Sequence, residues 1–450
     1  MAIVTVMGAS GATVNVTVDG GDTLSLARAY AKTLQDTAAG KTFSTLRSGG
    51  NMSTANNAVG VITVGGAYAL DGAYVNIVAG ALSTDAASSP VLTTPVDINA
   101  RGVTTPVDVV AGTLGGTTFL AGDGGGSFLG TAGNNTFVGE AGNFTIETGS
   151  GNDIVDTGGG NDTVNAGAGD NQIYLGDGSN AVASWGQDTI LGVAGVQSVT
   201  IYGGNSSVSL GSNAWVKDTA AGSTIAVGGG STVSGATRDT VSFTGTTGTI
   251  AGGMSDTISA AGDLVVNQGV GNSISVTGSL TFLNGTGMTT VTAGQSTIFG
   301  AGGLDMSVNG SGNTLFVANE GNQTLDGSLS GSPLHAFADS GTATFIGGTG
   351  ADTLVGGMGS ATMTGGLGDN LFAFTKGPSS GGDNVITDFG RSAGNVAALY
   401  QYGYENNNGL QSVLDAATVS GGNTTIQLSD STRITFLGVN DLKASDFTLS

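Results

Sequence analysis

The chain has 450 residues, no cysteine and a formal net charge of −22 at pH 7. A chain this acidic lacks the basic patches that hold phosphate groups, which excludes a nucleic-acid-binding protein. The missing cysteines exclude a disulfide framework and thiol chemistry, and no apolar run reaches the roughly 18 residues that predict a transmembrane helix.

Residues 1–110 differ from the rest and predict a small α+β module. Leu24, Ala27, Ala31 and Leu34 recur at helical spacing before Gly40, which favours one amphipathic helix. The motif TTPVD occurs at 93–97 and 104–108, and indicates a linker or a first irregular coil. Five of the 11 basic residues fall in this module: Arg28, Lys32, Lys41, Arg47 and Arg101.

A glycine-rich motif of nine residues repeats from Gly122 to Ser184, within a segment that we assign to residues 111–190. Four successive copies read EAGNFTIET, GSGNDIVDT, GGGNDTVNA and GAGDNQIYL. The front half of a copy is Gly, Asn and Asp, and the back half holds an apolar residue such as Val155, Val164 or Ile173. This short period predicts a turn and a very short strand, twice per coil, stacked on copies of itself with the apolar side chains inward.

The same motif returns in residues 346–375 as GGTGADTLV, GGMGSATMT and GGLGDNLFA. Residues 191–345 lose the period but keep short β-branched runs between glycine-rich turns, such as STIAVGGGSTVSG. We expect these residues to continue the solenoid as degenerate coils, the alternative being a disordered Gly/Ser linker. The predicted fold class is therefore mainly β: a parallel β-roll or β-solenoid with the N-terminal module and a C-terminal cap.

The nonapeptides resemble the calcium-binding repeat of RTX (repeats-in-toxin) proteins, G-G-x-G-x-D-x-U-x, over roughly 90 residues. The resemblance implies a parallel β-roll that holds Ca²⁺ between loops n and n+2 on the same edge. The carboxylate position then reads Asn135–Asp153–Asn171 on one edge and Phe144–Asp162–Asn180 on the other. In the second block it reads Asp352, Ala361 and Asn370. Phe144 and Ala361 cannot bind a metal through their side chains.

Calcium is also consistent with the chemistry of the residues. Ca²⁺ prefers short carboxylates and backbone carbonyls, and glycine lets a loop turn so that its carbonyls converge. Residues 102–375 hold 20 acidic residues against Lys217 and Arg238, so this stretch repels itself unless cations neutralise it. A Gly/Asn turn ladder that needs no metal is the alternative. The candidate calcium-binding residues are Asn135, Gly149, Gly151, Asp153, Gly158, Gly160, Asp162, Gly167, Gly169, Asp170, Asn171, Asn180, Gly348, Gly350, Asp352, Asp369 and Asn370.

Residues 376–450 predict a C-terminal cap and an export signal. The segments GGDNVITDFGRSAG and ITFLGVNDLKASDFTLS are similar to the ends of RTX proteins exported by type I secretion, where an uncleaved C-terminal segment is the address. The N-terminal MAIVTVMGASGATVNVTV lacks the basic and long apolar regions of a Sec signal peptide. We therefore expect the protein outside a Gram-negative bacterium or on its surface.

No catalytic motif stands out. His335 is the sole histidine, which excludes an H-E-x-x-H zinc site and a Ser–His–Asp triad behind the G-x-S-x-G matches at 377–381 and 390–394. A pair of aspartates acting as a glycosidase stays open as an alternative. Two tryptophans, Trp185 and Trp215, are few for a sugar cleft.

These observations predict a non-enzyme: a secreted, calcium-dependent structural protein that self-assembles into a surface layer, filament or biofilm matrix, with residues 1–110 as assembly domain. One alternative is a monomeric RTX adhesin, and another is a non-catalytic solenoid of a polysaccharide-active system. The expected partners are further copies of the chain, the type I secretion machinery and a cell-surface polysaccharide.

Overall fold

The computed structural model describes residues 2–7, 13–18, 42–49, 58–70, 76–80, 92–377, 381–405 and 408–450. Contacts divide the chain into two compact units, Met1–Val227 and Gly228–Ser450. The helix expected around Leu24–Leu34 lies outside the described residues. No helix within the described ranges is long and apolar enough to cross a membrane.

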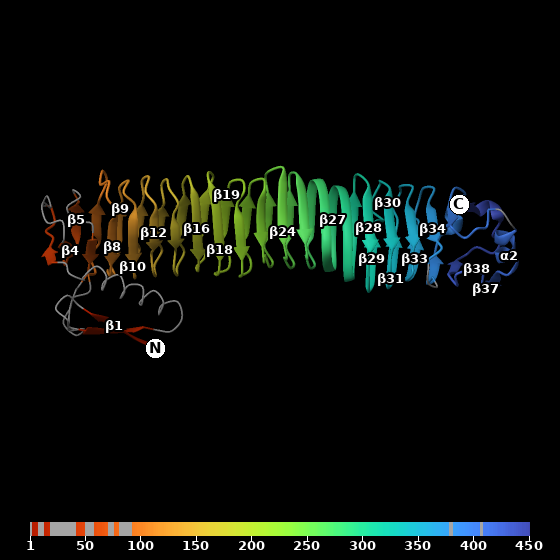
Figure 1. Cartoon of the computed structure of the whole chain (residues 1–450), viewed down its shortest axis with the longest axis horizontal. Helices are drawn as coiled ribbons and strands as arrows, with labels where there is room; N and C mark the ends of the chain where they lie inside the picture. The colour runs from red at the N-terminus through yellow and green to blue at the C-terminus, as the bar shows by residue number, and fades with distance from the viewer. Residues whose placement is uncertain are drawn as a thin grey trace. The chain divides into compact units, whose positions relative to one another are not determined.

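Unit 1 is a parallel β-solenoid in which alternate strands belong to two sheets (Figure 1). The first sheet contains β3 (Thr42–Thr45), β4 (Ala58–Ile62), β6 (Asn76–Ala79), β8 (Val107–Ala111), β10 (Gly126–Gly130), β12 (Phe144–Glu147), β14 (Thr163–Asn165), β16 (Ser179–Ser184), β18 (Val196–Ile201) and β20 (Trp215–Asp218). The second contains β5 (Gly66–Ala69), β7 (Val96–Asn99), β9 (Thr117–Leu120), β11 (Thr136–Val138), β13 (Ile154–Asp156), β15 (Gln172–Leu175), β17 (Thr189–Gly192), β19 (Ser207–Leu210) and β21 (Thr224–Val227). The expected β-solenoid is thus confirmed.

The register explains why the coils stack. Val155 pairs with Ile173, which pairs with Ile190, so one apolar side chain per strand lies above its counterpart in the next coil. All three are buried, whereas their neighbours in each strand point outward. Stacking is obligatory, because ordering nine residues costs about 9–18 kcal/mol of conformational entropy, while one buried Val or Ile contributes only about 1.5–3 kcal/mol.

A row of phenylalanines fills the core of the earlier coils. Phe119, Phe128, Phe137 and Phe144 are buried, and the ring centroids of Phe137 and Phe144 lie 5.2 Å apart in an edge-to-face arrangement. Phe144, which replaces a carboxylate in the repeat, therefore serves the core.

The parallel pairing reaches into residues that we expected to form the N-terminal module. β4, β6 and β8 pair in succession, and β8 pairs with β10. Both TTPVD segments lead into such strands, β7 and β8, and are parts of regular coils. An antiparallel hairpin of β1 (Ala2–Met7) and β2 (Thr13–Val18) forms a separate small sheet.

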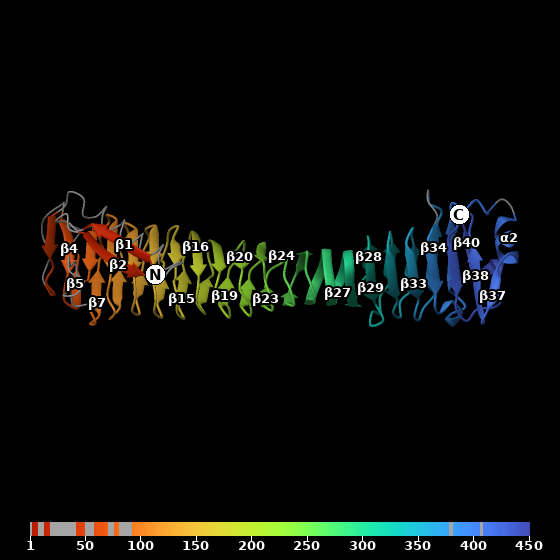
Figure 2. The same cartoon turned by 90° about the horizontal axis from the view of Figure 1, so that it is seen from below.

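Unit 2 is also a parallel solenoid (Figure 1 and Figure 2), so residues 228–345 are not a disordered linker. Its longest strand, β27 (Ser273–Gly310), winds through both sheets and pairs in turn with β25, β26, β28 and β29. The other parallel strands are β22 (Ser231–Ser234), β23 (Thr240–Phe243), β24 (Thr247–Ala251), β25 (Thr257–Ala260), β26 (Asp263–Asn267), β28 (Thr314–Ala318), β29 (Asn322–Asp326), β30 (Leu334–Ala338), β31 (Thr342–Ile346), β32 (Thr353–Gly356), β33 (Ser360–Thr364), β34 (Leu371–Thr375), β35 (Asp383–Ile386), β36 (Val396–Tyr400) and β40 (Phe447–Leu449).

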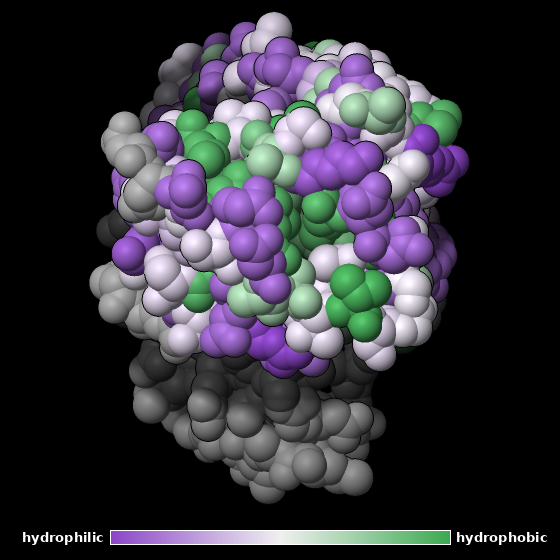
Figure 3. All heavy atoms as spheres, turned by 90° about the vertical axis from the view of Figure 1, so that its right-hand side faces the viewer, coloured by the Kyte–Doolittle hydropathy of each residue, from purple (hydrophilic) through white to green (hydrophobic). Residues whose placement is uncertain are grey.

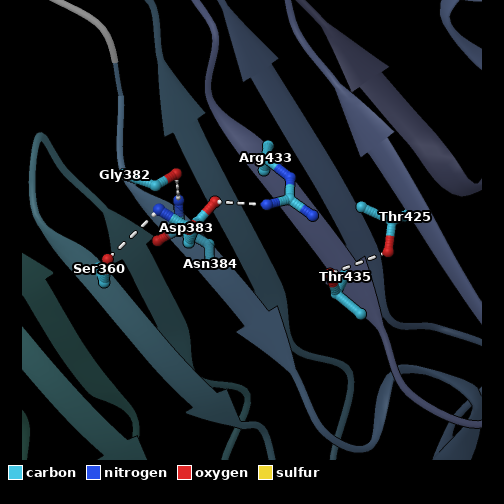
Figure 4. A network of polar contacts seen from close by, with 7 residues as sticks. All are labelled: Ser360, Gly382, Asp383, Asn384, Thr425, Arg433 and Thr435. Carbon is cyan, nitrogen blue, oxygen red and sulfur yellow. Dashed lines mark hydrogen bonds and ion pairs between the residues drawn. The ribbon is translucent and has the colours of Figure 1, made fainter.

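The C-terminal residues end this solenoid with antiparallel pairing. β39 (Arg433–Phe436) extends the sheet of β35 and also pairs antiparallel with β38 (Asn423–Gln427), which pairs with β37 (Thr418–Ser420). An ion pair of 3.4 Å between Arg433 and Asp383 joins β39 to β35, and the Asp383 amide donates to the Ser360 hydroxyl of β33 (Figure 4).

Two short 3-10 turns, Phe389–Arg391 and Ala444–Asp446, and the helix α2 (Gly409–Asp415) complete this end of unit 2. Its surface mixes hydrophilic with smaller hydrophobic areas (Figure 3), as suits a terminus in contact with water.

Candidate calcium sites

The glycines of the nonapeptide let the turns of successive coils stack at close range. Gly149, Gly151, Gly167 and Gly169 have φ values of +84°, +137°, +67° and +117°, a region that side chains disfavour. A Cβ atom on Gly167 would lie only 1.7 Å from the carbonyl oxygen of Gly149 in the preceding coil. Gly158 and Gly160 adopt the same conformations on the opposite edge. Each turn therefore brings its backbone carbonyls against the next turn.

A ladder of buried polar side chains runs along one edge, beside these turns. The backbone N–H of Asn135 donates to Asp153 Oδ1 at 2.6 Å, that of Asp153 to Asn171 Oδ1 at 2.9 Å, and that of Asn171 to Asp188 Oδ1 at 2.9 Å. The ladder begins where the Thr117 N–H donates to Asn135 Oδ1. Each rung thus satisfies a buried backbone donor of the coil before it.

The same arrangement recurs on the opposite edge and in the second block. The Phe144 N–H donates to Asp162 Oδ1 at 2.8 Å, and the Asp162 N–H to Asn180 Oδ1 at 2.9 Å. In unit 2 the rungs are Asp352, Asn370 and Asn395: the N–H of Leu334 donates to Asp352, that of Asp352 to Asn370, and that of Asn370 to Asn395. Ala361 is buried on the other sheet, in register with Ala343.

Asparagine and aspartate differ at the second side-chain atom. Asn135 Nδ2 donates to the carbonyl oxygens of Gly133 and Thr148, at 3.1 and 3.0 Å. Asn171 and Asn180 likewise donate to the carbonyls of Ala166 and Gly176. At an aspartate rung a carboxylate oxygen takes the place of this amide nitrogen. When the carboxylate is ionised, that oxygen carries no proton and cannot donate to the carbonyls.

Asp153 and Asp162 accordingly have a buried Oδ2 atom with no hydrogen-bond partner. The Thr148 hydroxyl, which is close to Asp153, donates instead to the Ala166 carbonyl at 2.7 Å. An unpaired buried carboxylate oxygen is costly. Carboxylate and carbonyl oxygens together are the donor set that Ca²⁺ prefers, so the residues fit this ion.

Burial changes the proton affinity of these groups. Removal from water raises the pKa of the Asp153, Asp162 and Asp352 carboxyl groups to about 6. It also raises the pKa of Asp188 above its ordinary value. A bound cation has the opposite effect, because it favours the ionised form.

Asp352 differs from the two aspartates of unit 1. Its Oδ2 accepts a hydrogen bond of 3.0 Å from the Gly348 N–H, while Oδ1 accepts from Leu334. Gly348 and Gly350 pack against the carbonyl of Ser330 and the backbone of Ser332. Both carboxylate oxygens of Asp352 are thus satisfied by protein donors, so a cation is less needed at this rung.

Asp170 and Asp369 lie on the outer side of the turns and are exposed. The Asp170 N–H donates to Asn152 Oδ1, and Asp369 Oδ1 accepts from the Ser392 hydroxyl. Neither side chain belongs to the buried ladder. Among the described residues no group of three or more His, Cys, Asp or Glu converges on one point. Backbone carbonyls must therefore complete any calcium site built here.

The nine-residue period missed three aspartates that belong to such ladders. Asp188 continues the first ladder, 17 residues after Asn171 rather than 18. In unit 2 the Asp239 N–H donates to Asp256 Oδ1, and the Asp256 N–H to Asn272 Oδ1 across 16 residues. A usable signal was the Asp or Asn directly before a short hydroxyl–β-branched pair, as in DTI, DTV and NSI.

Comparison with known families supports this geometry. A model of the RTX calcium-binding nonapeptide repeat matches residues 120–155, 129–164, 147–182 and 337–372. Residues 120–182 and 337–372 are therefore RTX calcium-binding nonapeptide repeats. RTX repeats of this kind bind Ca²⁺, and the matched residues include the Asp153, Asp162 and Asp352 rungs. No curated protein is similar enough to the whole chain to count as a relative.

The sole histidine, His335, is half-buried on β30, where its neighbours in register are Leu315 and Thr353.

Proposed function

We propose that this RTX repeat protein is a secreted, calcium-dependent structural protein that assembles on the surface of a Gram-negative bacterium into a layer, filament or biofilm matrix, and that it is not an enzyme. The observation that carries the proposal is the unpaired, buried Oδ2 of Asp153 and Asp162. A bound cation would satisfy these ionised oxygens, which couples folding to a calcium-rich environment. The proposed ligands are the candidate residues of the repeats.

Export before folding is consistent with this chemistry. Where calcium is scarce, the acidic coils repel one another and the chain stays unfolded, a form suited to passage through a secretion channel. We propose that residues 376–450 contain the type I secretion signal.

The outer edge of β3 in unit 1 supports self-assembly. Among the described strands, β3 pairs only with β4, whereas the Ala67 carbonyl of β5 accepts from the Gly49 N–H and the Ser48 hydroxyl. A strand edge such as that of β3 offers N–H and C=O groups to another chain. The antiparallel strands β37–β39 close unit 2 instead. Contacts between unlike surfaces do not close on themselves, so they propagate into filaments or sheets.

Assembly should depend on both calcium and protein concentration. We expect full-length protein in millimolar calcium to form ordered polymers, seen by electron microscopy and as large species in sedimentation velocity. A chelator should return it to monomers. A protein that is folded but monomeric at every concentration in calcium would contradict assembly and favour the adhesin alternative.

Truncation after Gly377 should abolish export. The shortened chain lacks β35–β40, and we expect it to accumulate inside the cell, measured by immunoblotting of medium and cells. Attaching residues 381–450 to an unrelated slow-folding passenger should restore export through a type I system. Secretion of the truncated chain at the wild-type level would show that the C-terminal residues do not contain the secretion signal.

A second candidate function is binding of a surface polysaccharide, either as an adhesin or as the non-catalytic part of a polysaccharide-active system. An aromatic surface in unit 1 favours it, as described next.

A further inference from the structure

The outer face of three neighbouring strands in unit 1 has an unusual composition. β16, β18 and β20 pair in parallel (β16 and β18 are labelled in Figure 1, β20 in Figure 2), and Ala181, Ser198 and Trp215 share one row across them. Ala183, Thr200 and Lys217 share the next row. Apart from Val196, Trp215 and Lys217, the side chains on this face are small.

Two aromatic rings border this face at one end. Trp185 and Tyr202 directly follow β16 and β18, and their rings stack with centroids 4.1 Å apart and planes inclined by 12°. They remain 37% and 45% exposed. The pair is therefore a preformed, rigid aromatic surface in contact with water.

Trp215 borders the other end and is 41% exposed. Directly after β20, the residue level with Tyr202 is Thr219, because Ile201 pairs with Asp218. Trp215 lies four residues before Thr219, so it is about 13 Å along the strand from the Trp185–Tyr202 pair. The chain has only two tryptophans, and both lie on this face with one side in water. Neither tryptophan nor Tyr202 belongs to the buried core, so core packing does not account for three large aromatic residues at these positions.

The electrostatics of this region differ from those of the rest of the chain. Between Gly178 and Val227, which the structure describes throughout, the two carboxylates Asp188 and Asp218 are at most 1% exposed. Lys217 is exposed and forms no ion pair with a described residue. In a protein of net charge −22, this face presents the Lys217 ammonium, and the exposed carboxylate of Asp177 comes just before the stretch, two residues ahead of β16.

We propose that this face, the Trp185–Tyr202–Trp215 surface, binds an acidic polysaccharide. Sugar rings stack their apolar C–H faces on the Trp185–Tyr202 pair and on Trp215, since aromatic rings offer flat, polarisable surfaces. The Lys217 ammonium pairs with a uronate carboxylate, and Ser198 and Thr200 offer hydroxyl groups between them. The site needs a folded unit 1 but not self-assembly.

Binding can be measured on the full-length protein in calcium. The probes are hyaluronan, which carries a glucuronate in every repeating unit, and dextran, which is neutral. Both tryptophans belong to the surface, so intrinsic tryptophan fluorescence reports occupancy directly, and retardation in native gels gives an independent affinity. We expect hyaluronan to change the fluorescence and retard the protein, with weaker binding as salt rises.

Variants separate this site from non-specific adhesion. Trp185→Ala and Tyr202→Ala should each weaken hyaluronan binding about tenfold, whereas Trp185→Phe should retain most of it. Lys217→Met should remove the preference for hyaluronan over dextran and the salt dependence. Tyr174→Ala is the matched control, because Tyr174 is an equally exposed ring, 40%, on the other sheet.

Absence of binding to both polymers would overturn the proposal, as would binding that is equal in Trp185→Ala and Tyr174→Ala. If Trp185→Ala instead dissociates a dimer in sedimentation without polysaccharide, the face is an interface between copies and the proposal fails. Loss of calcium-dependent polymers with hyaluronan binding intact would affect only the proposed assembly.

Discussion

Asp153→Asn raises the stability of the calcium-free protein and abolishes the calcium response of its rung. The new amide can donate to the carbonyls that surround this position, as Asn135 Nδ2 does with Gly133 and Thr148, and its Oδ1 still accepts the Asn135 N–H. Relief of one buried unpaired oxygen is worth about 1–3 kcal/mol. In calcium the order reverses, because the variant has lost an anionic ligand.

The measurement is thermal or urea unfolding followed by circular dichroism, in chelator and in millimolar calcium. Asp153→Ala should be less stable than wild type in both conditions, since it also removes the acceptor for the Asn135 N–H. Asp123→Asn, at an exposed turn position of the same solenoid, is the control for the change in net charge. Equal calcium stabilisation of wild type and Asp153→Asn would contradict a cation at this rung.

Two adjacent glycines of one loop should respond very differently to alanine. Gly158 has φ +68°, and a Cβ atom there would lie 2.1 Å from the carbonyl oxygen of Glu140. A Cβ on Gly159 would meet nothing closer than 3.8 Å. Gly158→Ala should therefore cost at least about 2 kcal/mol, from backbone strain and displacement of the stacked turn, and should weaken calcium binding at the adjacent Asp162 rung.

Gly159→Ala should leave the unfolding midpoint and the calcium affinity within error of wild type, which makes it the matched control. Isothermal titration with calcium and urea unfolding of both variants give the comparison. Similar losses in the two variants would show that the stacking of carbonyls against glycine is not what fixes these turns.

Much of the fold and of the ladder could be predicted because the sequence repeats. In coils of 18 residues, the residue before each short strand falls at the same place in every turn. The resemblance to the RTX repeat, applied to this register, pointed to Asp153, Asp162 and Asp352, and each is a buried rung. Fold class followed from the same period, since a single repeat cannot offset its own ordering entropy.

Asp188, Asp239 and Asp256 escaped this reasoning because the coils that hold them have 17 or 16 residues. A turn can be one or two residues shorter and still place the Asp or Asn before the next strand in the ladder. The hydrogen bonds between rungs are therefore kept where the 18-residue spacing is lost. Similarly, Trp185, Tyr202 and Trp215 are unevenly spaced in the sequence, and only the pairing of β16, β18 and β20 brings them onto one face.

The composition of the nonapeptide coils could be read from the repeats: glycine where the backbone turns, an apolar residue that faces the core, and Asn or Asp before most of the short strands. The sequence could not say which aspartates are satisfied. Asp153 and Asp352 occupy the same position of the motif, yet the second oxygen of Asp352 accepts the Gly348 N–H while that of Asp153 has no donor. This difference between the two aspartates is visible only in the folded chain, because the need for a cation depends on which backbone groups of the stacked turns face each carboxylate oxygen.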